Sequence, residues 1–254
     1  MGVVNVTPDS FSNGGRFLDQ EAAVSHARQL AAEGADILDL GGESTRPGAA
    51  PLSEADELKR ILPVLEKLAG FCVSVDTRRP AVMQAAIAAG ASMINDIQAL
   101  GAPGAIETVA ASRCAVCLMH MKGEPATMQQ APRYHDVVRE VRAFLKEAAR
   151  KAMFAGIGVD RIVVDPGFGF GKSAEHNLTL LRNLEKISDL PIMAGLSRKS
   201  TVGKLTGRPV DQRLAGSLAM ALLALERGAR ILRVHDVKET RDVIAVWQAY
   251  KNDA

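Results

Sequence analysis

Short runs rich in β-branched residues recur along this chain of 254 residues, and each is followed by a polar cluster and then by a helix-like stretch. This alternation is typical of repeated βα units. The runs predict eight strands, at residues 2–6, 36–40, 71–75, 92–95, 114–119, 161–164, 191–194 and 230–234. Helices are predicted at residues 19–33, 53–68, 80–90, 134–155, 174–187, 211–227 and 237–250, with a short one after Pro103. Eight βα units close into a (β/α)8 TIM barrel, whose active site is built at the carboxyl ends of the strands.

The length and composition limit the class of protein. A barrel of this type needs about 250 residues, so residues 1–254 are expected to form one domain. The net charge of +2, without a basic stripe, argues against a nucleic-acid partner. No apolar run approaches the roughly 18 residues that cross a bilayer, and no signal-peptide pattern opens the chain. Because three cysteines do not make a disulfide framework, a cytoplasmic protein with no membrane partner is expected.

Two motifs resemble ligand sites but have a simpler interpretation. Cys114 and Cys117 match a redox or metal pattern, yet residues three apart in a strand point to opposite faces. Two packed thiols are therefore expected. Residues 167–172 (GFGFGK) miss both the P-loop and the dinucleotide pattern by one residue. Their glycines are expected to allow a tight turn and the close approach of a ligand.

Carboxylate and amide side chains end three of the predicted strands. Asp76 follows the third strand, Asn95 ends the fourth and Asp165 follows the sixth. A buried carboxylate is costly unless it is paired, and a planar ring with adjacent N–H donors, such as a 2-amino-4-oxo pyrimidine, would supply the pairing. The alternative is that each residue caps a neighbouring helix or pairs with a nearby arginine.

Cationic side chains make up a second region of the same rim. It contains Arg46, Lys199, Arg233 and His235. The fork of an arginine binds two phosphate oxygens at once, so a diphosphate leaving group would fit. The alternative is a set of ordinary surface charges. Arg233 argues against that alternative, because it lies inside an otherwise apolar strand.

Five segments of the chain resemble the motifs of the dihydropteroate synthases, a family of pterin-binding enzymes. They occur in the family's order and at its spacing, from near the first residue to residue 237. The segments are 5–11 (NVTPDSF), 42–48 (GESTRPG), 165–172 (DPGFGFGK), 197–200 (SRKS) and 233–237 (RVHDV). Together they are a specific signature, whereas any one alone would carry moderate weight.

The resemblance implies an enzyme that joins 6-hydroxymethyl-7,8-dihydropterin diphosphate to p-aminobenzoate, giving 7,8-dihydropteroate and diphosphate in folate biosynthesis. Sulfonamides inhibit the family. By match, the pterin is bound by Asp76, Asn95, Ile97, Met119, Asp165, Gly195 and Lys199. The diphosphate is bound by Asn5, Arg46, Arg233 and His235, and Asn5 also contacts the Mg²⁺ cofactor. The p-aminobenzoate site comprises Thr45, Pro47, Phe170, Lys199 and Ser200, and catalytic roles fall to Lys199, Arg46 and Asn13.

The implied chemistry is a dissociative, SN1-like substitution. The bond to diphosphate can break first, because the electron-rich pterin stabilises the resulting cation. The protein would then mainly stabilise charge on the leaving group, and the aniline amine needs no strong general base. The loops after the first two strands are expected to close over the diphosphate and to exclude water.

Asn13 departs from the family pattern, in which an aspartate usually stands at this position. That aspartate is thought to order the closing loop and to favour the cation. Asparagine keeps the hydrogen-bonding capacity but loses the negative charge, so turnover is expected to be reduced while pterin binding is kept. The variant Asn13→Asp is expected to have a higher kcat in a steady-state assay; an unchanged kcat would refute this interpretation.

Two other functions share part of these features. A pterin-binding methyltransferase barrel that serves a corrinoid partner would keep the aspartate and asparagine contacts but would have little use for the cationic residues. A non-catalytic pterin-binding paralogue is the other alternative, and Asn13 favours it. A homodimer is expected, because the family commonly pairs through late helices and residues 214–225 are rich in Ala and Leu.

Overall fold

The protein is an eight-stranded parallel barrel in the computed structural model, which describes residues 1–6, 16–43, 52–124 and 127–252. The sheet order is β1 to β8 in sequence, and every neighbouring pair is parallel. The strands are β1 (Gly2–Asn5), β2 (Leu38–Gly41), β3 (Val73–Asp76), β4 (Met93–Asp96), β5 (Ala115–Met119), β6 (Ile162–Asp165), β7 (Ile192–Ala194) and β8 (Ala229–Leu232). The eight predicted strands are thus confirmed.

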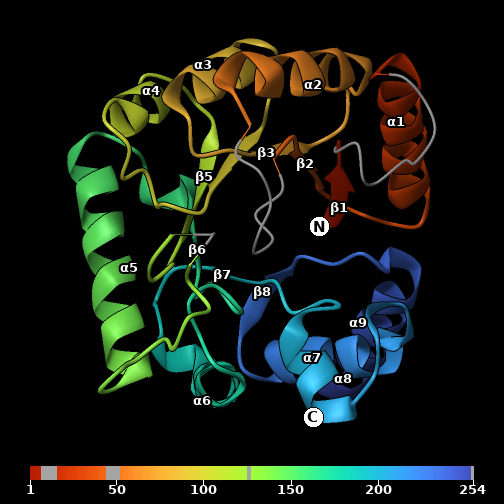
Figure 1. The fold of residues 1–254 in the computed structure, drawn as a ribbon, viewed down its shortest axis with the longest axis vertical. Coiled ribbons are helices and arrows are strands. Elements are labelled where there is room, and N and C mark those ends of the chain that lie inside the picture. The colour runs from red at the N-terminus through yellow and green to blue at the C-terminus, as the bar shows by residue number, and fades with distance from the viewer. Residues whose placement is uncertain (7–15, 44–51, 125–126, 253–254) are drawn as a thin grey trace.

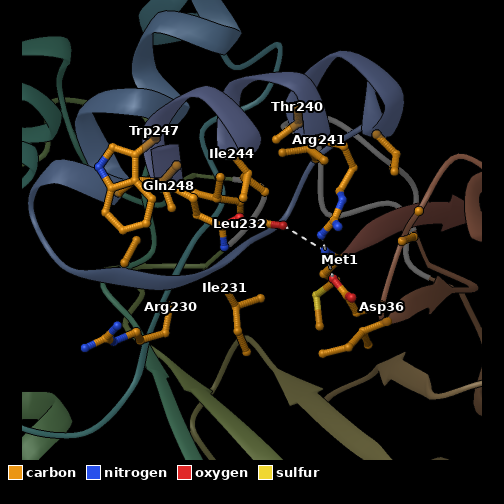
Figure 2. A pocket seen from close by; sticks show the side chains of 17 residues that line it. Met1, Asp36, Arg230, Ile231, Leu232, Thr240, Arg241, Ile244, Trp247 and Gln248 are labelled. Atoms are coloured by element: carbon orange, nitrogen blue, oxygen red, sulfur yellow. Dashed lines mark hydrogen bonds and ion pairs between the residues drawn. The ribbon is translucent and has the colours of Figure 1, made fainter. Parts of the chain in front are cut away.

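The barrel closes where the last strand meets the first. Gly2 forms a parallel bridge to Val234, and the Val3 amide donates to the Val234 carbonyl at 3.0 Å. The Met1 amino group donates to the Leu232 carbonyl at 3.0 Å, the contact drawn in Figure 2. Because these bonds satisfy both edges of the sheet, the (β/α)8 closure predicted from the sequence is confirmed.

Helices surround the strands as an outer ring (Figure 1). They are α1 (Arg16–Ala32), α2 (Glu54–Lys67), α3 (Pro80–Ala88), α4 (Ala105–Ala110), α5 (Val137–Phe154), α6 (Ala174–Arg182), α7 (Ser200–Thr206), α8 (Leu214–Glu226) and α9 (Val237–Asn252). Ser53 caps α2, since its hydroxyl accepts from the Asp56 amide at 3.1 Å. Gly34, which follows α1, has a φ of +100°, which favours glycine. None of the described helices is long and apolar enough to cross a membrane.

The helices that follow β6 and β7 differ from the sequence prediction. Helix α7 was not predicted, because its seven residues include β-branched side chains and Gly203 and show no apolar period. The helix predicted for 174–187 ends at Arg182, and a 3₁₀ turn, η3 (Leu184–Lys186), completes it. Pro63 lies within α2, which continues past it.

The core has an outer and an inner layer. The outer layer packs the helices against the barrel and includes Cys114. A smaller cluster fills the barrel interior: Met1, Met93, Cys117, Val163 and Met193. The two cysteines are buried in different clusters, which confirms the interpretation of packed thiols.

A cavity of about 440 Å³ lies at the amino-terminal ends of β1, β2 and β8 (Figure 2). Its lining is largely apolar, with Ile231, Ile244 and Trp247 among the side chains and an Asp36–Arg241 ion pair of 3.7 Å. The polar strand ends described next lie at the opposite end of the barrel.

Candidate active site

Side chains from neighbouring strands converge at the carboxyl-terminal mouth of the barrel. Alternation along each strand sends Asn5, Asp76 and Asp165 inward from the last positions of β1, β3 and β6. Gly41 lies between two of them: a Cβ there would be in ordinary contact with both, 3.9 Å from Asn5 Oδ1 and 3.7 Å from the Asp76 Cβ. Gly195 lies likewise beyond β7, where a Cβ would be 3.5 Å from Lys199 Nζ and 3.8 Å from the Arg233 Cβ. The predicted residues are therefore brought together.

Arg233 lies among the carboxylates. Its Nε donates to Asp39 Oδ2 at 2.6 Å, and its Nη2 donates to Asp76 Oδ2 at 3.1 Å. The two predicted regions, one acidic and one cationic, are therefore interleaved, since the closure of β8 onto β1 carries Arg233 next to β2 and β3. Although burial opposes it, Asp39 and Asp76 raise the pKa of Arg233, which stays cationic.

Asp39 was missed by the sequence analysis. It is fully buried on β2, and its Oδ2 also accepts from Asn95 Nδ2 at 3.3 Å. The available signal was a single aspartate within the apolar run ILDLGG, which resembles the signal of Arg233 within the run RILRV. An isolated charge in a buried strand needs a partner, so the two anomalies could have been matched to each other.

Three buried oxygens at this level have no hydrogen-bond partner among the described residues. They are Asp39 Oδ1, Ser74 Oγ and Asn95 Oδ1. Burial raises the pKa of Asp76 to about 7, although the neighbouring Arg233 acts in the opposite direction. Buried acceptors of this kind are normally satisfied, so this end of the barrel is suited to a ligand that presents N–H donors.

Asp165 and Lys199 form the other side of the mouth. Asp165 Oδ1 accepts from the Gly167 amide at 2.6 Å, and burial raises its pKa. Lys199 Nζ donates to the Phe168 carbonyl at 2.5 Å and lies 4.9 Å from the centroid of the Phe170 ring. Burial lowers the pKa of Lys199 to about 8, while Asp165 opposes that shift.

The glycine-rich segment after β6 is a tight turn, as predicted. Gly167, Gly169 and Gly171 have φ values of +66°, +82° and +63°. Gly167 and Gly171 allow the backbone of the loop after β5 to pack directly against this turn. A Cβ at Gly167 would lie 1.9 Å from the His120 carbonyl oxygen. His120 and Lys172, which contact each other across this turn, were also missed by the sequence analysis.

The remaining predicted residues occupy different positions around the mouth. Ile97 and Met119 are buried, at 5% and 4% exposure, after β4 and at the end of β5. His235 follows β8, and its Nδ1 lies 3.0 Å from Ser197 Oγ. Ser200 is exposed at the first position of α7.

Four predicted residues lie outside the described part of the chain: Asn13, Thr45, Arg46 and Pro47. The described residues on either side of 44–51 are connected by hydrogen bonds. Arg79 donates to both oxygens of Glu43 at 3.1 Å, and Glu43 Oε1 accepts from the Leu52 amide at 3.1 Å.

Asn5 is the predicted magnesium ligand. Within the described residues, no group of three or more His, Cys, Asp or Glu side chains is arranged to hold a metal. A single amide oxygen is still compatible with Mg²⁺, because this ion commonly keeps several waters and takes its other ligands from substrate phosphates.

Known proteins share both this fold and much of this sequence. A family model described as pterin binding enzyme matches residues 1–235. A dihydropteroate synthase of Haemophilus influenzae is 47% identical over 257 residues, covering 99% of this chain and 94% of the relative. The Xanthomonas albilineans dihydropteroate synthase solved with 4-aminobenzoic acid is 54% identical, with a TM-score of 0.93 and coverage of 98% and 92% of the two chains. The Yersinia pestis enzyme solved with a sulfonamide drug is 45% identical, with a TM-score of 0.93 and coverage of 99% and 93%.

Proposed function

The chain belongs to the dihydropteroate synthase family of pterin-binding enzymes, and from that membership we propose how its barrel mouth divides the work of the reaction. The reaction condenses 6-hydroxymethyl-7,8-dihydropterin diphosphate with p-aminobenzoate to give 7,8-dihydropteroate and diphosphate. These relatives are synthases, so neither the corrinoid-linked methyltransferase nor the non-catalytic paralogue is retained.

The pterin ring would bind to the acidic side of the mouth. Asp76, Asn95 and Asp165 would accept its ring and exocyclic N–H groups, with Ile97 and Met119 on the faces of the ring. The observation that supports this most is the set of buried oxygens without partners beside Asp76, within the described residues. An N–H group of the aminopyrimidine would satisfy Asn95 Oδ1, which a substrate without such donors could not do.

The diphosphate would lie against Arg233, His235 and Asn5. Arg233 keeps its charge beside Asp39, so it can stabilise the anion that forms as the C–O bond breaks. Asn5 would provide one oxygen ligand to Mg²⁺, an ion that neutralises phosphate charge when bound. With leaving-group charge stabilised in this way, we favour a dissociative substitution.

p-Aminobenzoate would bind between Phe170, Lys199 and Ser200. Lys199, whose ammonium lies over the Phe170 ring, offers a cation to the carboxylate of this substrate. The Phe170 ring offers an apolar face to the substrate's own ring. Sulfonamides share that shape, and the Yersinia pestis relative was solved with one. We therefore expect sulfonamides to compete with p-aminobenzoate here.

The proposal is tested by one assay with purified protein, the pterin diphosphate, Mg²⁺ and p-aminobenzoate. Formation of dihydropteroate and diphosphate in equal amounts is expected, and sulfonamide should raise the apparent KM for p-aminobenzoate. Binding of the pterin without any product would contradict the proposed reaction.

The pH dependence of pterin binding should follow Asp76. Its raised pKa, about 7, means that the free protein holds a proton there below pH 7, which must be lost before the carboxylate accepts N–H donors. Pterin affinity, measured by calorimetry with the diphosphate omitted, is therefore expected to increase as pH rises through about 7. Asp76→Asn should bind more weakly and lose this dependence. The contribution of Asp76 to the free energy of unfolding has the opposite pH dependence. Because its pKa is raised in the folded state, that contribution is largest at low pH and is lost as the pH rises through about 7.

We also propose that two chains pair through α8. Leu214, Leu218 and Leu222 recur every fourth residue, and Leu214 and Leu222 are 37% and 40% exposed. Leu205 and Val210 add further exposed apolar surface nearby in the sequence. Apolar side chains exposed along one face of a helix suit an interface. Sedimentation equilibrium should give twice the chain mass, and Leu222→Glu should shift the population towards monomer.

A further inference from the structure

Lys172 is a buried cation that the proposed reaction does not use. The residue is only 2% exposed, and its Nζ lies among four acceptors. Nζ donates to the carbonyls of Gly167 at 2.9 Å, Phe170 at 3.0 Å and His120 at 3.3 Å, and it lies 2.9 Å from His120 Nδ1. Burying an ammonium is costly, so four contacts of this quality mark a specific role.

These contacts join two loops at the barrel mouth. His120 follows β5, while Gly167 and Phe170 belong to the turn after β6. The loops meet without spare room, because a Cβ at Gly171 would lie 2.1 Å from the Lys122 carbonyl oxygen. The ammonium therefore holds the turn against the neighbouring loop.

The opposite side of the same turn faces the mouth. Lys199 donates to the Phe168 carbonyl and lies over the Phe170 ring. The turn is thus held between two ammonium groups: Lys172 on the side of the loop after β5, and Lys199 on the side of the mouth. The Phe170 carbonyl bonds to the first and the Phe170 ring contacts the second, so a shift at Lys172 changes where that ring lies.

We propose that Lys172 is a positioning residue for the second substrate: it fixes the turn that presents Phe170, and so sets the affinity for p-aminobenzoate more than for the pterin. This inference rests on the proposed function, since it assumes that Phe170 contacts p-aminobenzoate. The pterin is less affected, because Asp165 lies at the end of β6 and its place is fixed by the strand.

The charges around Lys172 are consistent with this role. Burial, followed by Lys172 itself, lowers the pKa of His120 to about 3, so the imidazole is neutral and can accept through Nδ1. Burial lowers the pKa of Lys172 to about 7, with Asp165 opposing. Either protonation state of the amine keeps N–H donors for the carbonyls of Gly167 and Phe170.

The test compares Lys172→Met, whose unbranched side chain is one atom shorter and has no donor, with Lys172→Gln, which is as short as methionine but keeps two N–H groups. Steady-state kinetics would give kcat and both KM values, and thermal unfolding would be recorded alongside. For Lys172→Met the KM for p-aminobenzoate is expected to rise about tenfold or more, with the KM for the pterin diphosphate within about twofold. Lys172→Gln should restore part of the loss.

Lys186→Met is the control, because Lys186 lies on η3, before β7, and its exposed Nζ bonds to Asn183 Oδ1 at 3.0 Å. It should leave both KM values unchanged. Equal increases in both KM values for Lys172→Met, or none, would overturn the inference. So would failure of both Lys172 variants to fold, since the lysine would then serve the whole barrel. An inactive wild-type protein would instead refute the proposed function.

Discussion

Arg233→Ala is expected to abolish turnover and to destabilise the barrel at the same time. Removing a preorganised cation from the leaving group should lower kcat at least about 100-fold. The same change leaves Asp39 fully buried with its main partner gone, a situation that typically costs about 3–5 kcal/mol of unfolding free energy. Product formation and urea denaturation measure the two effects on the same preparation.

A double variant separates the loss of turnover from the loss of stability. Arg233→Ala combined with Asp39→Asn removes the buried charge, so much of the unfolding free energy should return while turnover stays lost. Arg241→Ala is the control, because its 3.7 Å ion pair with Asp36 is exposed and lies at the other end of the barrel. It should change stability by less than about 1 kcal/mol and leave kcat unaltered. Turnover that recovers with stability would show that Arg233 serves only the fold.

The barrel could be predicted from sequence because its signal repeats. Every predicted strand exists, and the largest errors lie at the ends, as in β2, which begins at Leu38 and not at residue 36. Helix α7 could not be predicted, because a seven-residue helix with an internal glycine has too few residues to show a period. Its position depends on tertiary contact: a Cβ at Gly203 would lie 2.3 Å from the Arg213 guanidinium.

The site could be predicted only where residues end strands. Asp76, Asn95 and Asp165 were found by their position, and the structure brings them to one mouth. Partnerships across the barrel could not be found, because the 194 positions that separate Asp39 from Arg233 carry no local trace of their contact. Lys172 was missed for a different reason: the glycines before it dominated the pattern, and its four acceptors come together only once two loops meet.

Gly167→Ala is expected to be the most damaging of the small substitutions in the described chain. A Cβ at this position would lie 1.9 Å from the His120 carbonyl oxygen, and the φ of +66° is already unfavourable for alanine. Backbone cannot move aside as a flexible side chain can, so β5 and β6 must separate at their carboxyl ends. The loss in unfolding free energy should exceed about 3 kcal/mol, and pterin binding should weaken because the separation of the strands displaces Asp165 at the end of β6.

Gly70→Ala isolates the backbone part of that loss. Gly70 also has a positive φ, +95°, but nothing lies within 4 Å of the point that a Cβ would occupy there. Only the cost of the left-handed conformation therefore remains, about 1–2 kcal/mol. The difference between the two variants, measured by urea denaturation, is then the cost of the collision between the loops after β5 and β6. Equal losses would mean that these loops can separate freely, and a turn that yields so easily could not hold Phe170 in place for the second substrate.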